Sequence, residues 1–258
     1  MVQEFASVVV SALRGGDGRF DLLGSALSRS DDPASVAAVR VLGADALAPC
    51  TLSGKLPTEA DVILFEGAVA AFPPESGSSS VSAWSHWGMR AALGRVLAGD
   101  GTGTGTGLDG AGPDAAGLAG IGPDGDDPDA AGPDPEWVTA EPWQRMTYQL
   151  SQVASLAVPG LPSPLSAAVA KRPVDLARGF VRAVRRRDWL QAAGAARWLA
   201  MTDGVPLSLG LDAGLDFVHH MGAADARVAL HVRAAQLSRD GAERAGAGGT
   251  GADRVARA

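Results

Sequence analysis

The sequence contains very little cysteine, tyrosine and lysine. Its 258 residues include one cysteine, Cys50, one tyrosine, and two lysines against many arginines. A single cysteine excludes an internal disulfide bond and any metal site built from several thiolates, and it is consistent with a reducing compartment. Aromatic residues make up 5% of the chain, and alanine, which buries little area, supplies much of its 46% hydrophobic content. The composition therefore predicts a thin hydrophobic core.

The sequence also shows no familiar catalytic motif, and we expect no targeting segment. No apolar run approaches the roughly 20 residues that cross a bilayer. Glu4, with no basic residue before Phe5, is unlike a secretory signal. We find no P-loop, no nucleophile-elbow serine and no His-Glu-x-x-His pattern. We expect a cytoplasmic protein with no cofactor and no membrane association, and the excess of arginine, alanine and glycine is typical of a GC-rich bacterial genome.

An acidic, glycine-rich segment divides the chain. Residues 99–135 contain eight aspartates and no basic residue, and removing these charges from a formal net charge of −7 leaves the remainder near +1. Their Gly-Thr and Gly-Pro-Asp repeats cannot bury enough apolar area to offset a backbone ordering cost of about 1–2 kcal/mol per residue. We predict a disordered linker over 99–135, between an N-terminal helical lobe (1–98) and a C-terminal helical lobe (136–239), followed by a disordered tail (240–258).

Hydrophobic residues recur at helical spacing through both predicted lobes. Residues 173–238 form four short helical patterns, each with its own start and stop signals. In the N-terminal lobe, Asp32 precedes a proline as a helix cap, and Thr58 with Asp61 resembles a capping box. We predict one further helix over 137–156. The fold class is therefore all-α, with antiparallel helices in two small lobes.

Two helical segments share a sequence pattern. Residues 87–98 and 189–200 both read Trp, seven residues, Arg, one residue, Leu-Ala. Such matches also arise by chance in an alanine-rich chain, so a helical-repeat architecture is a hypothesis here.

One candidate metal or acid/base site lies in the C-terminal lobe. Asp212, Asp216 and His220 are spaced four residues apart on one predicted helix, and His231 lies on the next. Residues at this spacing share a helix face, so these carboxylates and imidazoles could converge between antiparallel helices and bind a metal. The alternative is that Asp212 favours a helix N-terminus and that the histidines are surface or core residues.

The other candidate site is a basic helix face, which we call the arginine face. Its residues recur at helical spacing: Arg178, Arg182, Arg185 and Arg186. Guanidinium groups in a stripe suit phosphate or carboxylate partners. Three features argue against nucleic acid as the partner: the acidic net charge of the chain, the absence of a recognisable nucleic-acid-binding motif, and the absence of aromatic residues interleaved with these arginines. The simplest alternative is an ordinary solvated helix face with no partner.

These observations favour a non-enzymatic interaction or accessory protein that acts through a protein partner, because antiparallel helix pairs form grooves suited to partners. A helical metal-dependent enzyme, with its site around 212–231, is one alternative. A nucleic-acid or phosphate binder that uses the region 178–187 is another. The partner, the pathway and the oligomeric state stay open at this stage.

Overall fold

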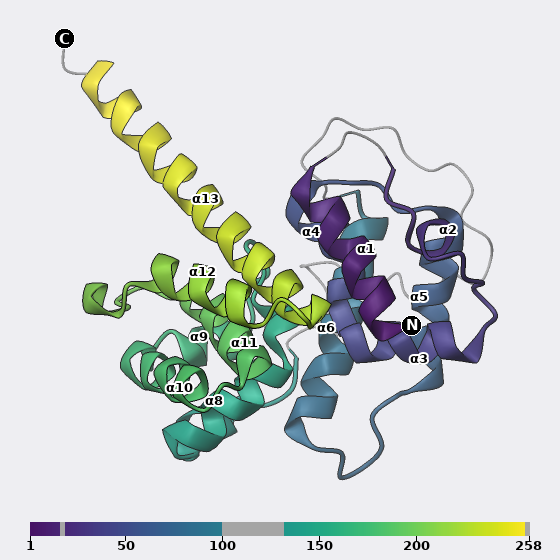
Figure 1. Cartoon of the computed structure of the whole chain (residues 1–258), viewed down its shortest axis with the longest axis horizontal. Coiled ribbons are helices and arrows are strands. Elements are labelled where there is room, and N and C mark those ends of the chain that lie inside the picture. The colour runs from purple at the N-terminus through teal and green to yellow at the C-terminus, as the bar shows by residue number, and fades with distance from the viewer. Residues whose placement is uncertain (16–18, 100–131, 256–258) are drawn as a thin grey trace.

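Helices account for nearly all regular structure in the protein. The computed structural model describes residues 1–15, 19–99 and 132–255. Within these ranges the chain forms helices joined by loops and contains no β-strand, which confirms the all-α class (Figure 1). Most of the segment expected to be a linker, residues 100–131, lies outside the described residues.

The N-terminal half is a group of helices around one hydrophobic cluster. Its elements are α1 (Val2–Arg14), α2 (Leu22–Ser25), α3 (Pro33–Leu42), η1 (Gly43–Leu47), α4 (Ala48–Ser53), α5 (Glu59–Ala71) and α6 (Ser80–Leu97). The two expected caps are confirmed: Asp32 Oδ1 accepts the Ala34 amide at 3.0 Å, and Thr58 with Asp61 forms a capping box at the start of α5. Phe5 and Phe65 lie fully inside the cluster, which we call the N-terminal core.

The C-terminal half packs around the short helix α11. Its elements are α7 (Glu136–Ala140), α8 (Trp143–Gln152), η3 (Ala154–Leu156), α9 (Pro164–Val169), α10 (Pro173–Arg185), α11 (Trp189–Leu199), η4 (Leu207–Leu209), α12 (Leu211–Met221) and α13 (Ala226–Val255). The buried side chains around Trp198 and Phe180 form the C-terminal core. The continuous helix expected over 137–156 is wrong: Pro142 lacks an amide proton and disfavours helix in the residue before it, so the chain breaks between α7 and α8. A second break, at Val153, separates α8 from η3.

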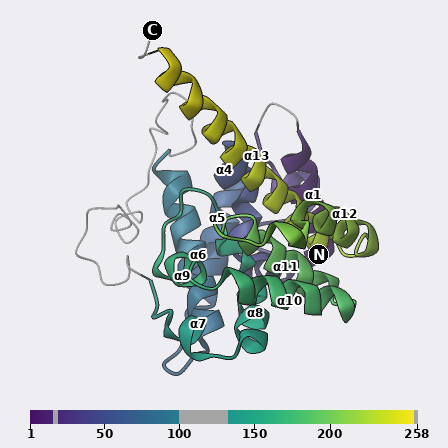
Figure 2. The ribbon, with the colours of Figure 1, turned by 90° about the vertical axis from the view of Figure 1, so that its left-hand side faces the viewer.

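Helix α13 is longer than its sequence pattern indicated. The apolar pattern ends near Ser238, yet α13 runs to Val255 and so covers most of the segment 240–258 that was expected to be a tail. Alanine, arginine and glutamate favour helix, and no proline interrupts the segment. The C-terminal end of α13 extends beyond the other helices in both views (Figures 1 and 2).

The two cores share helices across the expected lobe boundary. On α6, Trp84 belongs to the C-terminal core, whereas Met89, little more than one turn later, belongs to the N-terminal core. On α13, Val232 packs in the C-terminal core and Leu230 in the N-terminal core. Figure 1 shows α13 passing between the two halves. Each half therefore completes its core with side chains from the other.

Contrary to the expectation from the sequence, one apolar run in the described chain has the length and composition of a membrane-spanning segment. This run, Pro33–Ser53, has a mean hydropathy of 1.3. It comprises α3, η1 and α4, is 67% buried, and supplies Val39 and Leu47 to the N-terminal core. Core segments of folded domains can have the same length and composition. The burial of this run in the N-terminal core accounts for its apolar composition.

The two segments with the shared pattern lie on α6 and α11. Their arginines have different surroundings, since Arg197 is fully buried and Arg95 is partly exposed. The two arginines therefore have different roles, and their positions do not support the repeat hypothesis.

Candidate functional site

Helix α10 presents the arginine face to solvent. Pro173 starts the helix, and Leu176, Phe180 and Ala183 bury its opposite side in the C-terminal core. The exposed side carries the residues expected from the sequence: Arg178, Arg182, Arg185 and Arg186. Helical periodicity alone thus separates the apolar and basic sides, as the spacing indicated.

Packing adds an aromatic ring to this face. The guanidinium carbon of Arg182 lies 5.9 Å from the centre of the Trp143 ring on α8, within the range of a cation–π contact. Gly179 permits this close helix pair, since a side chain at that position would collide with Thr147 on α8. Helical spacing within α10 gave no sign of Trp143, because α8, η3 and α9 all precede α10 in the chain. The arginine face therefore combines positive charge with a half-buried indole.

The arginines differ in how far they are already paired. Arg178 Nη1 lies 3.1 Å from Asp175, a carboxylate that also binds Arg172 at 2.8 Å. The guanidinium groups of Arg185 and Arg186 make no hydrogen bond or ion pair with a residue in the described ranges. The C-terminal turn of α10 is therefore the part whose charge is available to a partner.

The structure does not gather the four residues of the expected metal site into one cluster. Asp212 pairs with Arg239 at 2.7 Å, while Asp216 and His220 are exposed on α12. His231 points instead into the interface between the two cores. Among the described residues, no group of three or more His, Cys, Asp and Glu side chains is arranged to bind a metal. Helical spacing predicts that Asp212, Asp216 and His220 lie on one helix, α12. It gives no information on which side of α13, the helix that carries His231, faces α12.

A buried ion pair joins the two halves instead. Arg197 on α11 is fully buried, and its Nη1 donates to both carboxylate oxygens of Asp45 on η1, at 2.6 and 2.8 Å. Arg197 Nε donates to the Ala157 carbonyl at 3.1 Å. Because the two charges come from different halves, we call this contact the inter-core ion pair. It fixes α11 against η1.

His231 borders this ion pair. Its Nδ1 lies 3.4 Å from both Asp45 Oδ2 and Arg197 Nη1, and its side chain is 13% exposed. Burial lowers the pKa of His231 from 6.5 to about 4, because desolvation outweighs the attraction of Asp45, which raises the pKa. Arg197 and Arg227 lower this pKa further, and Asp225 raises it. His231 is therefore neutral at pH 7.

The cavity beside Asp45 and His231 is small. Its volume is about 50 Å³, and Ser155 and Gln152 also line it. This volume is enough for a few water molecules and well below the roughly 300 Å³ of small ligand pockets. The inter-core ion pair and His231 therefore form a structural contact, and the cavity beside them has no room for an organic substrate.

We expect acidification to destabilise the protein through His231. A histidine whose pKa is lowered on folding contributes stability that is complete above the unfolded pKa of 6.5 and is lost as the pH falls toward 4. Between pH 7 and pH 5, the free energy of unfolding should fall by about 2 kcal/mol. Urea titrations across this range measure it. The control variant His220→Gln, at an exposed histidine, should show the same loss of unfolding free energy between pH 7 and pH 5, and His231→Gln should show a much smaller loss. An equal loss in His231→Gln would show that His231 does not cause the pH dependence.

Cys50 is a buried thiol with no catalytic character. It is 6% exposed, and burial, with Asp61 as a second cause, raises its pKa to about 12. A thiol must lose its proton to act as a nucleophile, so Cys50 is held in the unreactive form. Cys50 therefore acts as a small apolar residue of the N-terminal core.

Comparison with known proteins gives no relative: no protein-family model, curated protein or solved structure matches the chain.

Proposed function

We propose that the protein is a non-enzymatic binding protein that engages an acidic segment of a partner protein through the arginine face. The observation that carries the proposal is the solvent-exposed C-terminal turn of α10, where Arg185 and Arg186 have no partner among the described residues and Arg182 lies over Trp143. Carboxylate side chains form bidentate pairs with guanidinium groups, and the indole offers apolar contact area beside them.

A protein partner fits the rest of the molecule better than nucleic acid does. The chain carries a net charge of −7 and has a pI of about 5.1, whereas nucleic-acid-binding domains are usually basic. The arginine face covers one side of a single 13-residue helix, α10. Trp143 is the one feature that favours nucleic acid, because bases stack on aromatic rings, and the experiment below includes that alternative.

Fluorescence anisotropy with three labelled probes tests this proposal at physiological salt. The probes are a glutamate-rich peptide, a single-stranded DNA and a duplex DNA of matched charge. We expect the peptide to bind most tightly. Arg182→Gln/Arg186→Gln should weaken it about three- to tenfold, because exposed ion pairs contribute a few tenths of a kcal/mol to about 1 kcal/mol each.

The matched control removes two exposed arginines elsewhere. Arg19→Gln/Arg244→Gln makes the same change in net charge away from α10, and it should leave peptide binding unchanged. Equal weakening by both double variants would show non-specific attraction and would overturn the proposal. Tighter binding of either DNA than of the peptide would replace the proposed partner class with nucleic acid.

A further inference from the structure

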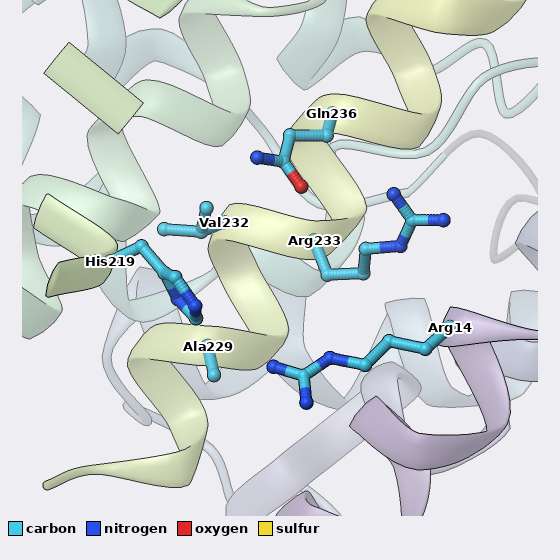
Figure 3. A pocket seen from close by; sticks show the side chains of 6 residues that line it. All are labelled: Arg14, His219, Ala229, Val232, Arg233 and Gln236. Atoms are coloured by element: carbon cyan, nitrogen blue, oxygen red, sulfur yellow. The ribbon is translucent and has the colours of Figure 1, made fainter. Parts of the chain in front are cut away.

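A second candidate site lies where three helices meet. A pocket of about 350 Å³ opens between the end of α1, the last turn of α12 and the middle of α13 (Figure 3). Its volume falls in the range of about 300–1,000 Å³ that is typical of small-ligand sites. It is lined by Arg14, His219, Ala229, Val232, Arg233 and Gln236. The site is separate from both the arginine face and the inter-core ion pair.

The polar groups in this pocket are rich in hydrogen-bond donors. Arg14 and Arg233 each bring a guanidinium group, Gln236 a carboxamide and His219 an imidazole, and none of the described lining residues is acidic. A pocket with two fixed positive charges and no carboxylate favours an anion, and guanidinium groups match the oxygens of a phosphate.

The two arginines are held differently. Arg233 Nε donates to the Leu13 carbonyl at the end of α1, at 3.2 Å, which anchors its side chain while the terminal nitrogens stay available. The Arg14 side chain extends from the last turn of α1 toward α13 (Figure 3). Its guanidinium makes no hydrogen bond or ion pair with any residue in the described ranges. Arg14 is thus a charged group that faces the pocket without a structural partner.

His219 supplies an independent indication of a ligand. Its ring extends from α12 toward Ala229 (Figure 3), and its Nδ1 is shielded from solvent with no hydrogen-bond partner in the described part of the chain. A buried polar atom without a partner costs free energy, so native proteins rarely keep one unless water or a ligand satisfies it. Ala229 and Val232 add apolar surface beside these polar groups.

We propose that this pocket binds a small phosphate monoester. Arg14 and Arg233 contact the phosphate oxygens, His219 and Gln236 supply further hydrogen bonds, and Ala229 and Val232 contact the organic part of the ligand. The volume of the pocket leaves space for such a part beside the phosphate.

Isothermal titration of the whole protein with inorganic phosphate, glycerol phosphate and acetate, at constant ionic strength, tests the proposal. We expect saturable binding of both phosphate probes, tighter binding of the monoester, and at least tenfold weaker binding of acetate. Arg14→Gln should weaken phosphate binding about tenfold or more, since a hydrogen bond between charged groups is lost. Circular dichroism should show an unchanged fold, because Arg14 is exposed and its guanidinium has no described partner.

Two further variants separate the site from general charge effects. His219→Gln keeps a hydrogen-bonding side chain and should weaken phosphate binding less than Arg14→Gln does. Arg29→Gln makes the same charge change at an exposed loop residue outside both proposed sites and should leave the affinity unchanged. Absence of saturable phosphate binding, acetate binding of equal strength, or equal weakening by Arg29→Gln would overturn the proposal. None of these outcomes bears on binding at the arginine face.

Discussion

Replacing Arg197 with leucine should lower the free energy of unfolding by about 3–5 kcal/mol, because it leaves the Asp45 carboxylate buried without its partner. Asp45 is 2% exposed and receives two hydrogen bonds from Arg197 Nη1, at 2.6 and 2.8 Å. Asp45→Ala should cost a similar amount, since it leaves the fully buried guanidinium unpaired. For a domain whose total stability is about 5–15 kcal/mol, such a loss is large. Urea denaturation at pH 7 measures it.

The double variant Asp45→Ala/Arg197→Leu separates the net contribution of the pair from the cost of breaking it. An apolar replacement of both partners removes both buried charges, so it should be less destabilising than either single variant. The resulting coupling energy should therefore exceed about 3 kcal/mol. Additive single effects would show that the two charges do not interact, which would contradict the inter-core ion pair.

Trp84→Ala should cost about 3–5 kcal/mol of unfolding free energy, as truncation of a large buried side chain does. Trp84 has no exposed area and packs edge to face with Trp87, with ring centres 5.3 Å apart. It lies on α6 but fills the C-terminal core, so the resulting cavity forms at the junction of the halves. Thermal and urea unfolding both measure this loss.

A matched exposed position provides the control for Trp84. Leu207 is 99% exposed, and Leu207→Ala should change stability by no more than about 0.5 kcal/mol. If Trp84→Ala were as mild as Leu207→Ala, the side chain of Trp84 would not be part of the core.

Local signals in the sequence were sufficient to predict much of the secondary structure. Caps act over three or four residues, so Asp32 and Thr58 mark helix starts directly. Asp188 caps α11 in the same way and accepts the Gln191 amide at 3.1 Å. The break at Pro142 was also a local signal, and it was outweighed by the apolar pattern around it. The far end of α13 had no apolar periodicity to mark it.

The tertiary contacts could not be predicted in the same way. Arg197 and Asp45 are separated by 152 positions, and helical periodicity gives no information on which helices meet. Asp45 carried one usable signal, because it is an isolated charge within the apolar run from Val41 to Ala48. The arginine face was predictable because one helix contains it. The phosphate pocket was not, because it needs the arrangement of α1, α12 and α13.

The central structural claim is that the two cores, which share α6 and α13, unfold together. Tryptophan fluorescence reports on the C-terminal core, since Trp84, Trp137 and Trp198 lie in it. The thiol of Cys50 reports on the N-terminal core, where it is buried. Equilibrium urea unfolding should therefore be followed by tryptophan fluorescence and by the reactivity of Cys50 toward a thiol reagent. We expect the two transitions to share one midpoint. If Cys50 became reactive at urea concentrations where the tryptophan signal is still native, or the reverse, the cores would be independent and the claim would be contradicted.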